Sequence, residues 1–166
     1  MKKNKGFSLI ELLIVVAIIL IIAAIAIPNL LRSRIAANEA SATASLRTLN
    51  TAEVTYASTY NSGFTSTLNQ LATATPAGTQ PSWSAADLVD PILSGTQSAA
   101  SMSFTKNGFV FTYDTGAGVY PQIATYGVHA DPMARGSSGQ RSFFSDQSAV
   151  VRANATNAAT GTDNPI

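Results

Sequence analysis

Hydrophobic residues follow three successive patterns along this chain. Residues 7–27 form an apolar run with a single charged residue, Glu11, near its start. Between residues 35 and 60 the apolar positions recur at spacings of three, four and seven, which is typical of one face of an amphipathic helix. Beyond residue 101 apolar and polar residues alternate, as they do in half-buried strands. The pattern predicts an α+β fold, in which a long N-terminal helical spine packs on a small antiparallel sheet.

The predicted helix extends over residues 7–60 and stops at Asn61-Ser62-Gly63. Pro28 lies just past the apolar run and divides the helix into an assembly segment and an amphipathic spine. Because proline lacks an N–H group and crowds the preceding turn, it predicts a kink, with a simple helix end as the alternative. Glu39 and Glu53 share the spacing of the apolar stripe and are expected at its edges. The stripe itself consists of Ile35, Ala42, Leu46, Leu49, Tyr56 and Tyr60.

After the helix we expect a variable connecting region over residues 61–100, a sheet over 101–152 and a loose C-terminal tail over 153–166. Asn107-Gly108, flanked by alternating apolar residues, predicts a tight hairpin. A loop is expected at Asp131-Pro132 with Gly136 to Gly139. The other predicted strands are Ile123–Val128, Arg141–Ser145 and Ala149–Arg152.

In the connecting region, Ala85–Leu93 is expected to form a short helix led by Ser84. Trp83, the only tryptophan, is expected to close the core, with an interface anchor as the alternative.

The apolar run is long enough to cross a membrane, since 21 helical residues rise about 31 Å. The three lysines before it favour a cytoplasmic N-terminus. Three interpretations compete: a secretory signal peptide cut near Ala24-Ile25-Ala26, a plain anchor, and a short leader cut between Gly6 and Phe7. The first two leave Glu11 without a role, and a carboxylate inside such a run is costly enough to be a functional candidate.

Lys5-Gly6-Phe7-Ser8-Leu9-Ile10-Glu11, followed by the apolar run and Pro28, resembles the class III signal sequence of type IV pilins and type II secretion pseudopilins. The resemblance covers residues 5–35. It implies a leader of residues 1–6, cleavage by a prepilin peptidase after Gly6, and methylation of the new N-terminal Phe7. It also implies the partners of such subunits: sister copies in a helical fibre, the inner membrane, minor pilins, and pilus or type II secretion assembly machinery.

Glu11 is the predicted assembly and register residue. If helices stack in a fibre core, an unpaired carboxylate there costs several kcal/mol of desolvation. The run holds no lysine or arginine, so the compensating cation is the ammonium of Phe7, either on a neighbouring copy or on the same chain. Pairing with a neighbour sets the axial register, because a slip leaves both charges unsatisfied. A tolerated acid at the level of the lipid headgroups is the alternative.

Composition argues against other classes of function. The formal net charge is +1, and −2 without the three leader lysines, so no specific nucleic-acid partner is inferred. Cysteine is absent, which removes disulfides and thiolate metal sites. His129 is expected to be a solvated strand-end residue, since no zinc or catalytic motif surrounds it. We therefore expect no enzyme, no metal and no cofactor, with a calcium site at Asp131 and Asp146 as the alternative.

These observations predict a prepilin that is assembled through its apolar helix into a type IV pilus or pilus-like fibre. A pseudopilin of a type II secretion system is the alternative, because it shares every N-terminal feature. Before assembly the protein is expected to span the bacterial inner membrane once, with its N-terminus in the cytoplasm. After assembly it is expected in an extracellular pilus or a periplasmic pseudopilus.

Overall fold

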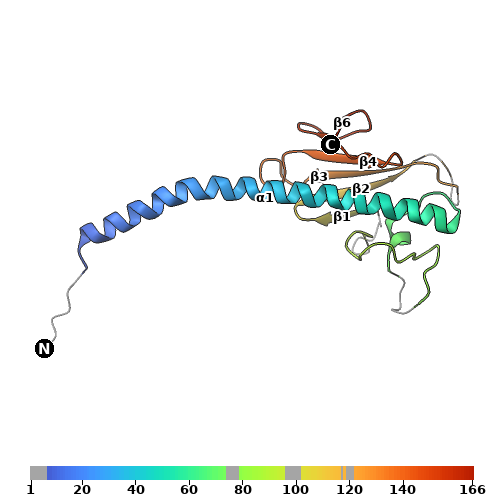
Figure 1. Cartoon of the computed structure of the whole chain (residues 1–166), viewed down its shortest axis with the longest axis horizontal. Coiled ribbons are helices and arrows are strands. Elements are labelled where there is room, and N and C mark those ends of the chain that lie inside the picture. Colours follow the sequence, from blue (N-terminus) through green and yellow to red (C-terminus); the bar gives the residue numbers. More distant parts are fainter. Residues whose placement is uncertain (1–6, 74–78, 96–101, 117, 119–121) are drawn as a thin grey trace. The chain divides into compact units, whose positions relative to one another are not determined.

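The computed structural model describes residues 7–73, 79–95, 102–116, 118 and 122–166. By its internal contacts the chain divides into two units, Met1–Arg34 and Ile35–Ile166. The helix α1, Leu9–Tyr60, supplies most of the first unit and the spine of the second (Figure 1). Pro28 lies inside α1, so the alternative of a helix end at this proline is wrong. The predicted kink at Pro28 stays a prediction.

The first unit is an apolar helical segment with no interior of its own. Its described large hydrophobic side chains are all substantially exposed, from Leu9 at 80% to Leu31 at 44%. Among the described residues, α1 is the helix that is long and apolar enough to cross a membrane, with a mean hydropathy of 3.3 in its most apolar window. A surface of this kind must find another apolar surface, which is either lipid or protein.

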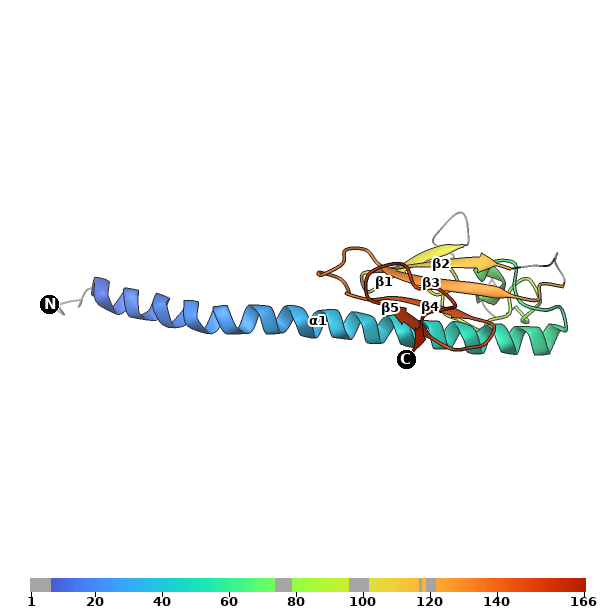
Figure 2. The same ribbon diagram turned by 90° about the horizontal axis from the view of Figure 1, so that it is seen from above.

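In the second unit an antiparallel sheet of six strands lies along α1, as both views show (Figure 1, Figure 2). The strands follow one another in sequence order, so each pairs with its neighbour along the chain. A short 3-10 helix, η1 (Leu68–Leu71), precedes the sheet. The strands are β1 (Ser103–Lys106), β2 (Phe109–Thr115), β3 (Tyr126–Pro132), β4 (Ser142–Asp146), β5 (Arg152–Asn154) and β6 (Asn164–Pro165). The predicted α+β fold is confirmed.

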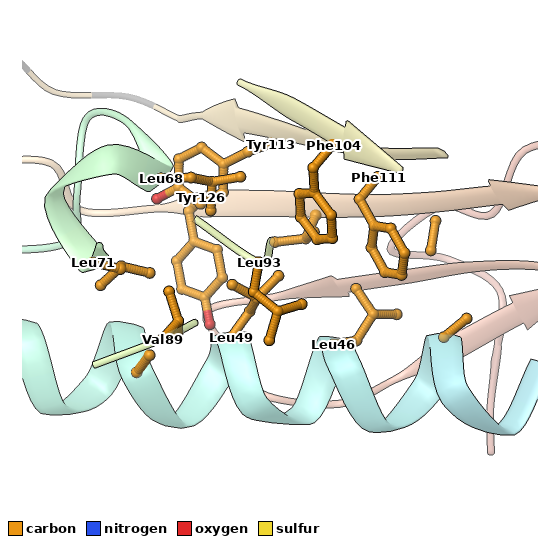
Figure 3. Close-up of a cluster of buried hydrophobic side chains, with 14 of the residues drawn as sticks. Leu46, Leu49, Leu68, Leu71, Val89, Leu93, Phe104, Phe111, Tyr113 and Tyr126 are labelled. Carbon is orange, nitrogen blue, oxygen red and sulfur yellow. The ribbon is translucent and has the colours of Figure 1, made fainter. Parts of the chain in front are cut away.

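The core lies between α1 and the inner face of the sheet (Figure 3). Leu46 and Leu49 of α1 are fully buried and point toward the aromatic side chains of the first three strands, including Phe111 and Tyr126. Full burial of one such side chain contributes about 1.5–3 kcal/mol. The predicted stripe is confirmed in its central positions, because Ala42 and Tyr56 are buried as well.

The hairpin predicted at Asn107-Gly108 joins β1 to β2. Both residues have positive φ values, 48° and 76°, as a type I′ turn requires. The pairing of Lys106 with Phe109 closes the turn. A side chain at Gly108 would come within 2.8 Å of the Ser138 Cβ atom, so the adjacent loop also favours glycine here.

Two predictions for the connecting region are wrong. No helix forms over Ala85–Leu93, because the N–H groups of residues 86–89 donate to the carbonyls of residues 70–72 instead of to their own segment. Asp87 has a φ of 54°, which also interrupts a helix. Trp83 does not close the core, since it is 54% exposed; its carbonyl accepts a hydrogen bond from the Tyr56 hydroxyl of the helix at 2.6 Å.

The end of the chain also differs from the prediction. Asp131-Pro132, expected in a loop, is the last part of β3, where inward-facing Val128 and Ala130 continue the alternation. Gly136 to Gly139 lie in the loop between β3 and β4, as expected. The expected loose tail adds β6 to the sheet.

Side-chain bonds hold that segment in place. The Arg135 guanidinium donates four hydrogen bonds of 2.6–3.1 Å, to the Ser142 hydroxyl and to the carbonyls of Gln140, Ala155 and Asn157.

Candidate functional site

The start of α1 is built around Glu11. Ser8 is the N-cap residue, since its carbonyl accepts the first helical hydrogen bond from Leu12. The Ser8 N–H donates to Glu11 Oε2 at 2.8 Å. This contact is one half of a capping box, in which the third residue of a helix satisfies the N–H of the cap. The carboxylate therefore has a partner in its own chain and lies at the positive end of the helix dipole.

From the sequence, Glu11 was predicted to pair with the Phe7 ammonium, and this cap was not predicted. The signal was available, because Ser-x-x-Glu before an apolar run is the signature of a capping box. Phe7 is 75% exposed and precedes the helix. Gly6, the other half of the predicted cleavage site, lies outside the described residues. The roles of Gly6, Phe7 and Glu11 in cleavage, methylation and register stay predictions.

A second functional carboxylate, Glu39, fastens the spine helix to the sheet. Its Oε1 accepts the backbone N–H groups of Gln140 and Arg141 at 2.8 and 3.0 Å. Its Oε2 accepts Nε and Nη2 of Arg141 at 3.0 and 2.8 Å, which is a bidentate ion pair. The Arg141 guanidinium also lies over the Phe143 ring, 5.3 Å from its centroid.

Burial alone would raise the pKa of Glu39, but the two backbone N–H groups and the Arg141 guanidinium outweigh it and lower the pKa below its usual value. The carboxyl group is therefore held in its charged form.

Glu53 is a third carboxylate on the same helix, and its environment is the opposite. It is fully buried and accepts the Thr65 N–H at 3.0 Å and the Thr65 hydroxyl at 2.6 Å. The Tyr113 hydroxyl joins the cluster by donating to the Thr65 carbonyl at 2.9 Å. No cation pairs with Glu53 in the described part of the chain. Burial raises the pKa of Glu53, with the Thr65 and Tyr113 contacts offsetting part of the rise.

Both glutamates were expected at the edges of the helical stripe, but the structure places them inside, at 8% and 0% exposure. Their spacing with the buried leucines was the signal that could have found them. Together they attach α1 to the loop before β4 and to the segment that follows the helix. Between the two glutamates, Asn50 of α1 adds a contact to β4 by donating to Ser145 Oγ at 2.7 Å.

The other candidate residues of the sequence are not brought together. His129 lies in the middle of β3, not at a strand end, with Nε2 3.4 Å from Asp114 Oδ2 and its ring against Phe144. Asp146 is opposite Gly127, so Asp131 lies four residues further along β3. That spacing corresponds to about 13 Å, too far for a shared calcium ion. Within the described ranges, no three His, Cys, Asp or Glu side chains gather around a common point.

Comparison with known proteins finds similarity over part of the chain. Residues 1–27 match the prokaryotic N-terminal methylation motif. The chain is 61% identical over 46 residues, 28% of its length, to the type IV wide pilus major component PilA4 of Thermus thermophilus. It is 48% identical over 54 residues, 32% of its length, to the type IV major pilin protein PilA of Myxococcus xanthus.

These matched segments cover 35% and 24% of the two relatives. No solved structure matches the chain. The resemblance drawn from the residues around Gly6 and Glu11 is confirmed: the chain carries the prokaryotic N-terminal methylation motif and is similar over part of its length to type IV pilins.

Proposed function

We propose that this protein is a non-enzymatic structural subunit of a type IV pilus, assembled through the apolar segment of α1. The observation that carries the proposal is the combination of that exposed apolar helix with an N-terminal methylation motif. Both similar relatives are described as major pilus components, which favours a pilus over a type II secretion pseudopilus.

In this proposal a prepilin peptidase cuts between Gly6 and Phe7, and the new N-terminus is methylated. The precursor spans the inner membrane with its N-terminus in the cytoplasm, since the leader carries three lysines. Assembly then exchanges lipid for sister helices around the apolar segment. The fibre is extracellular, and minor pilins and the assembly machinery are other chains.

Glu11 has two proposed tasks in this sequence of events. In the single subunit it caps α1 through Ser8, which lowers the cost of holding a carboxylate at membrane depth. In the fibre it pairs with the Phe7 ammonium of a neighbouring copy and fixes the axial register. The two tasks need different chemistry, because a cap needs only an acceptor oxygen whereas pairing needs a negative charge.

Mass spectrometry of the mature protein tests processing: the expected chain begins at a methylated Phe7. Detection of a chain that begins near Ile27 would refute the proposal, since the apolar helix would then be discarded. Shearing of surface fibres tests assembly, with this subunit as the expected main component.

Glu11→Ala and Glu11→Gln separate the two tasks of the carboxylate. The glutamine variant keeps an acceptor for the Ser8 N–H group but carries no charge. We expect both variants to be exported and cleaved and both to lose fibres. Wild-type fibre yield from Glu11→Gln would mean that capping is the whole role of this residue.

A further inference from the structure

A groove of about 340 Å³ lies between α1 and the turn that joins β4 to β5 in the second unit. Its lining is mainly apolar, and Val54, which is 52% exposed, contributes to it. Arg47 also lines the groove, and its exposed guanidinium makes no ion pair with any described residue. The groove therefore combines an apolar surface with an uncompensated positive charge.

A projection with the complementary chemistry lies at the end of β3. Met133 is 64% exposed, and its backbone is held in place by an N–H donated to the Gly108 carbonyl at 2.9 Å. Asp131 precedes it by two residues and makes no ion pair within the described ranges. The nearby Arg135 is engaged elsewhere, by its four hydrogen bonds to the C-terminal segment and the β4 end of the loop.

The projection cannot reach the groove of its own chain. Its loop is tied to the helix at Asn38, which donates to the Ser138 carbonyl at 2.9 Å, whereas Thr51 marks the middle of the groove. The 13 residues between Asn38 and Thr51 correspond to about 20 Å along the helix axis. Trp83 is also exposed, but it lies at the level of Tyr56 and lacks this axial offset.

We propose that Met133 and Asp131 of one copy dock into the groove of the next copy, with Met133 against Val54 and Asp131 facing Arg47. Two different, complementary surfaces make a heterologous contact, which repeats without closing and so builds a filament. The offset between projection and groove directs that repeat along the spine helix. This inference rests on the proposed function, because it supplies the contact between heads that accompanies helix stacking.

Disulfide trapping tests the contact directly, because the natural chain has no cysteine and engineered thiols are the only ones present. The full-length double variant Val54→Cys/Met133→Cys is expressed with its own assembly machinery, and sheared fibres are oxidised and run on non-reducing gels. We expect a ladder of covalent multimers that a reducing agent collapses to monomer. Each single cysteine variant should give at most dimers.

Val54→Cys/Thr105→Cys is the matched control, because Thr105 is exposed on β1 and faces away from the core. A ladder of equal strength from this control would overturn the contact. Wild-type fibre yields from Val54→Cys/Met133→Cys without any ladder would also overturn it, while leaving the proposed function intact. Absence of fibres from the wild-type protein would refute the proposed function, and this contact with it.

Charge reversal gives an independent readout. Arg47→Asp and Asp131→Arg should each lower the yield of sheared fibres several-fold without changing the amount of subunit in the membrane. The double variant Arg47→Asp/Asp131→Arg should recover most of the yield, because the two charges exchange places. If the double variant is no better than the worse single variant, the two residues do not face each other.

Discussion

Glu39→Ala is expected to lower the free energy of unfolding of the head by about 3 kcal/mol. The substitution removes the acceptor of four hydrogen bonds of 2.8–3.0 Å, two from backbone N–H groups and two from Arg141. Breaking a buried ion pair costs ~3–5 kcal/mol, because the remaining partner is left without compensation. The lower end applies here, since the Arg141 side chain is 46% exposed and water can solvate it.

Thermal unfolding of the full-length protein in detergent, followed by circular dichroism, measures this loss as a fall in Tm of about 10 °C. Glu39→Gln should lie between the wild type and Glu39→Ala, because its amide oxygen can still accept the two backbone N–H groups. Thr48→Ala, at an exposed position of the same helix, should shift Tm by less than about 2 °C. A fall below about 3 °C for Glu39→Ala would refute the assignment of Glu39 as the main attachment.

The stability difference between the wild type and Glu39→Ala should also depend on pH. The pKa of Glu39 is lowered in the folded protein, so its contribution to stability is present above the unfolded-state value of about 4.3. It is lost as pH falls through the folded-state pKa. The difference between wild type and Glu39→Ala should therefore be constant near neutral pH and shrink in acid. A difference that grows on acidification would show that the sign of the linkage is wrong.

Three further predictions concern residues of the head. Glu53→Gln should match or exceed wild-type stability at pH 8 and lose that advantage at pH 4, measured by denaturant unfolding, because burial raises the pKa of Glu53 and its contribution falls as pH rises. Gly108→Ala should cost more than Gly136→Ala in the same assay: both glycines have positive φ, but an added Cβ meets Ser138 at 2.8 Å in the first and nothing within 4 Å in the second. Arg135→Ala should expose the C-terminal segment to limited proteolysis while the β1–β2 hairpin stays protected, as peptide mapping would reveal.

The spine helix and the first hairpin could be predicted because their signals are local. A stripe such as Leu46 and Leu49 repeats with the helical period, and Asn107-Gly108 specifies its turn through two positive φ values. The N-terminal motif was likewise contained in a few adjacent residues. Its structural consequence, the Ser8–Glu11 cap, is equally local, because Ser-x-x-Glu before an apolar run is the signature of a capping box.

The helical spacing could have placed Glu39 inside the head, but its partners could not be predicted in the same way, because they are distant in sequence. Gln140 and Arg141 lie 101 and 102 residues from Glu39, and nothing local marks the pair. The short helix predicted before β1, over Ala85–Leu93, does not form for a related reason. The N–H groups of its first residues donate to carbonyls around Leu71, so this stretch does not form a helix despite its helical composition. β6 was hidden because two residues give no alternation to detect.

The four Arg135 hydrogen bonds hold the C-terminal segment on the head by groups that do not respond to pH or to redox conditions. The four acceptors are a hydroxyl and three backbone carbonyls, none of which ionises in the physiological range. Thiol reductants therefore leave this closure untouched, and so does mild acid. Denaturants such as guanidinium chloride compete for the same carbonyls. We therefore expect them to release the C-terminal segment before the rest of the head unfolds.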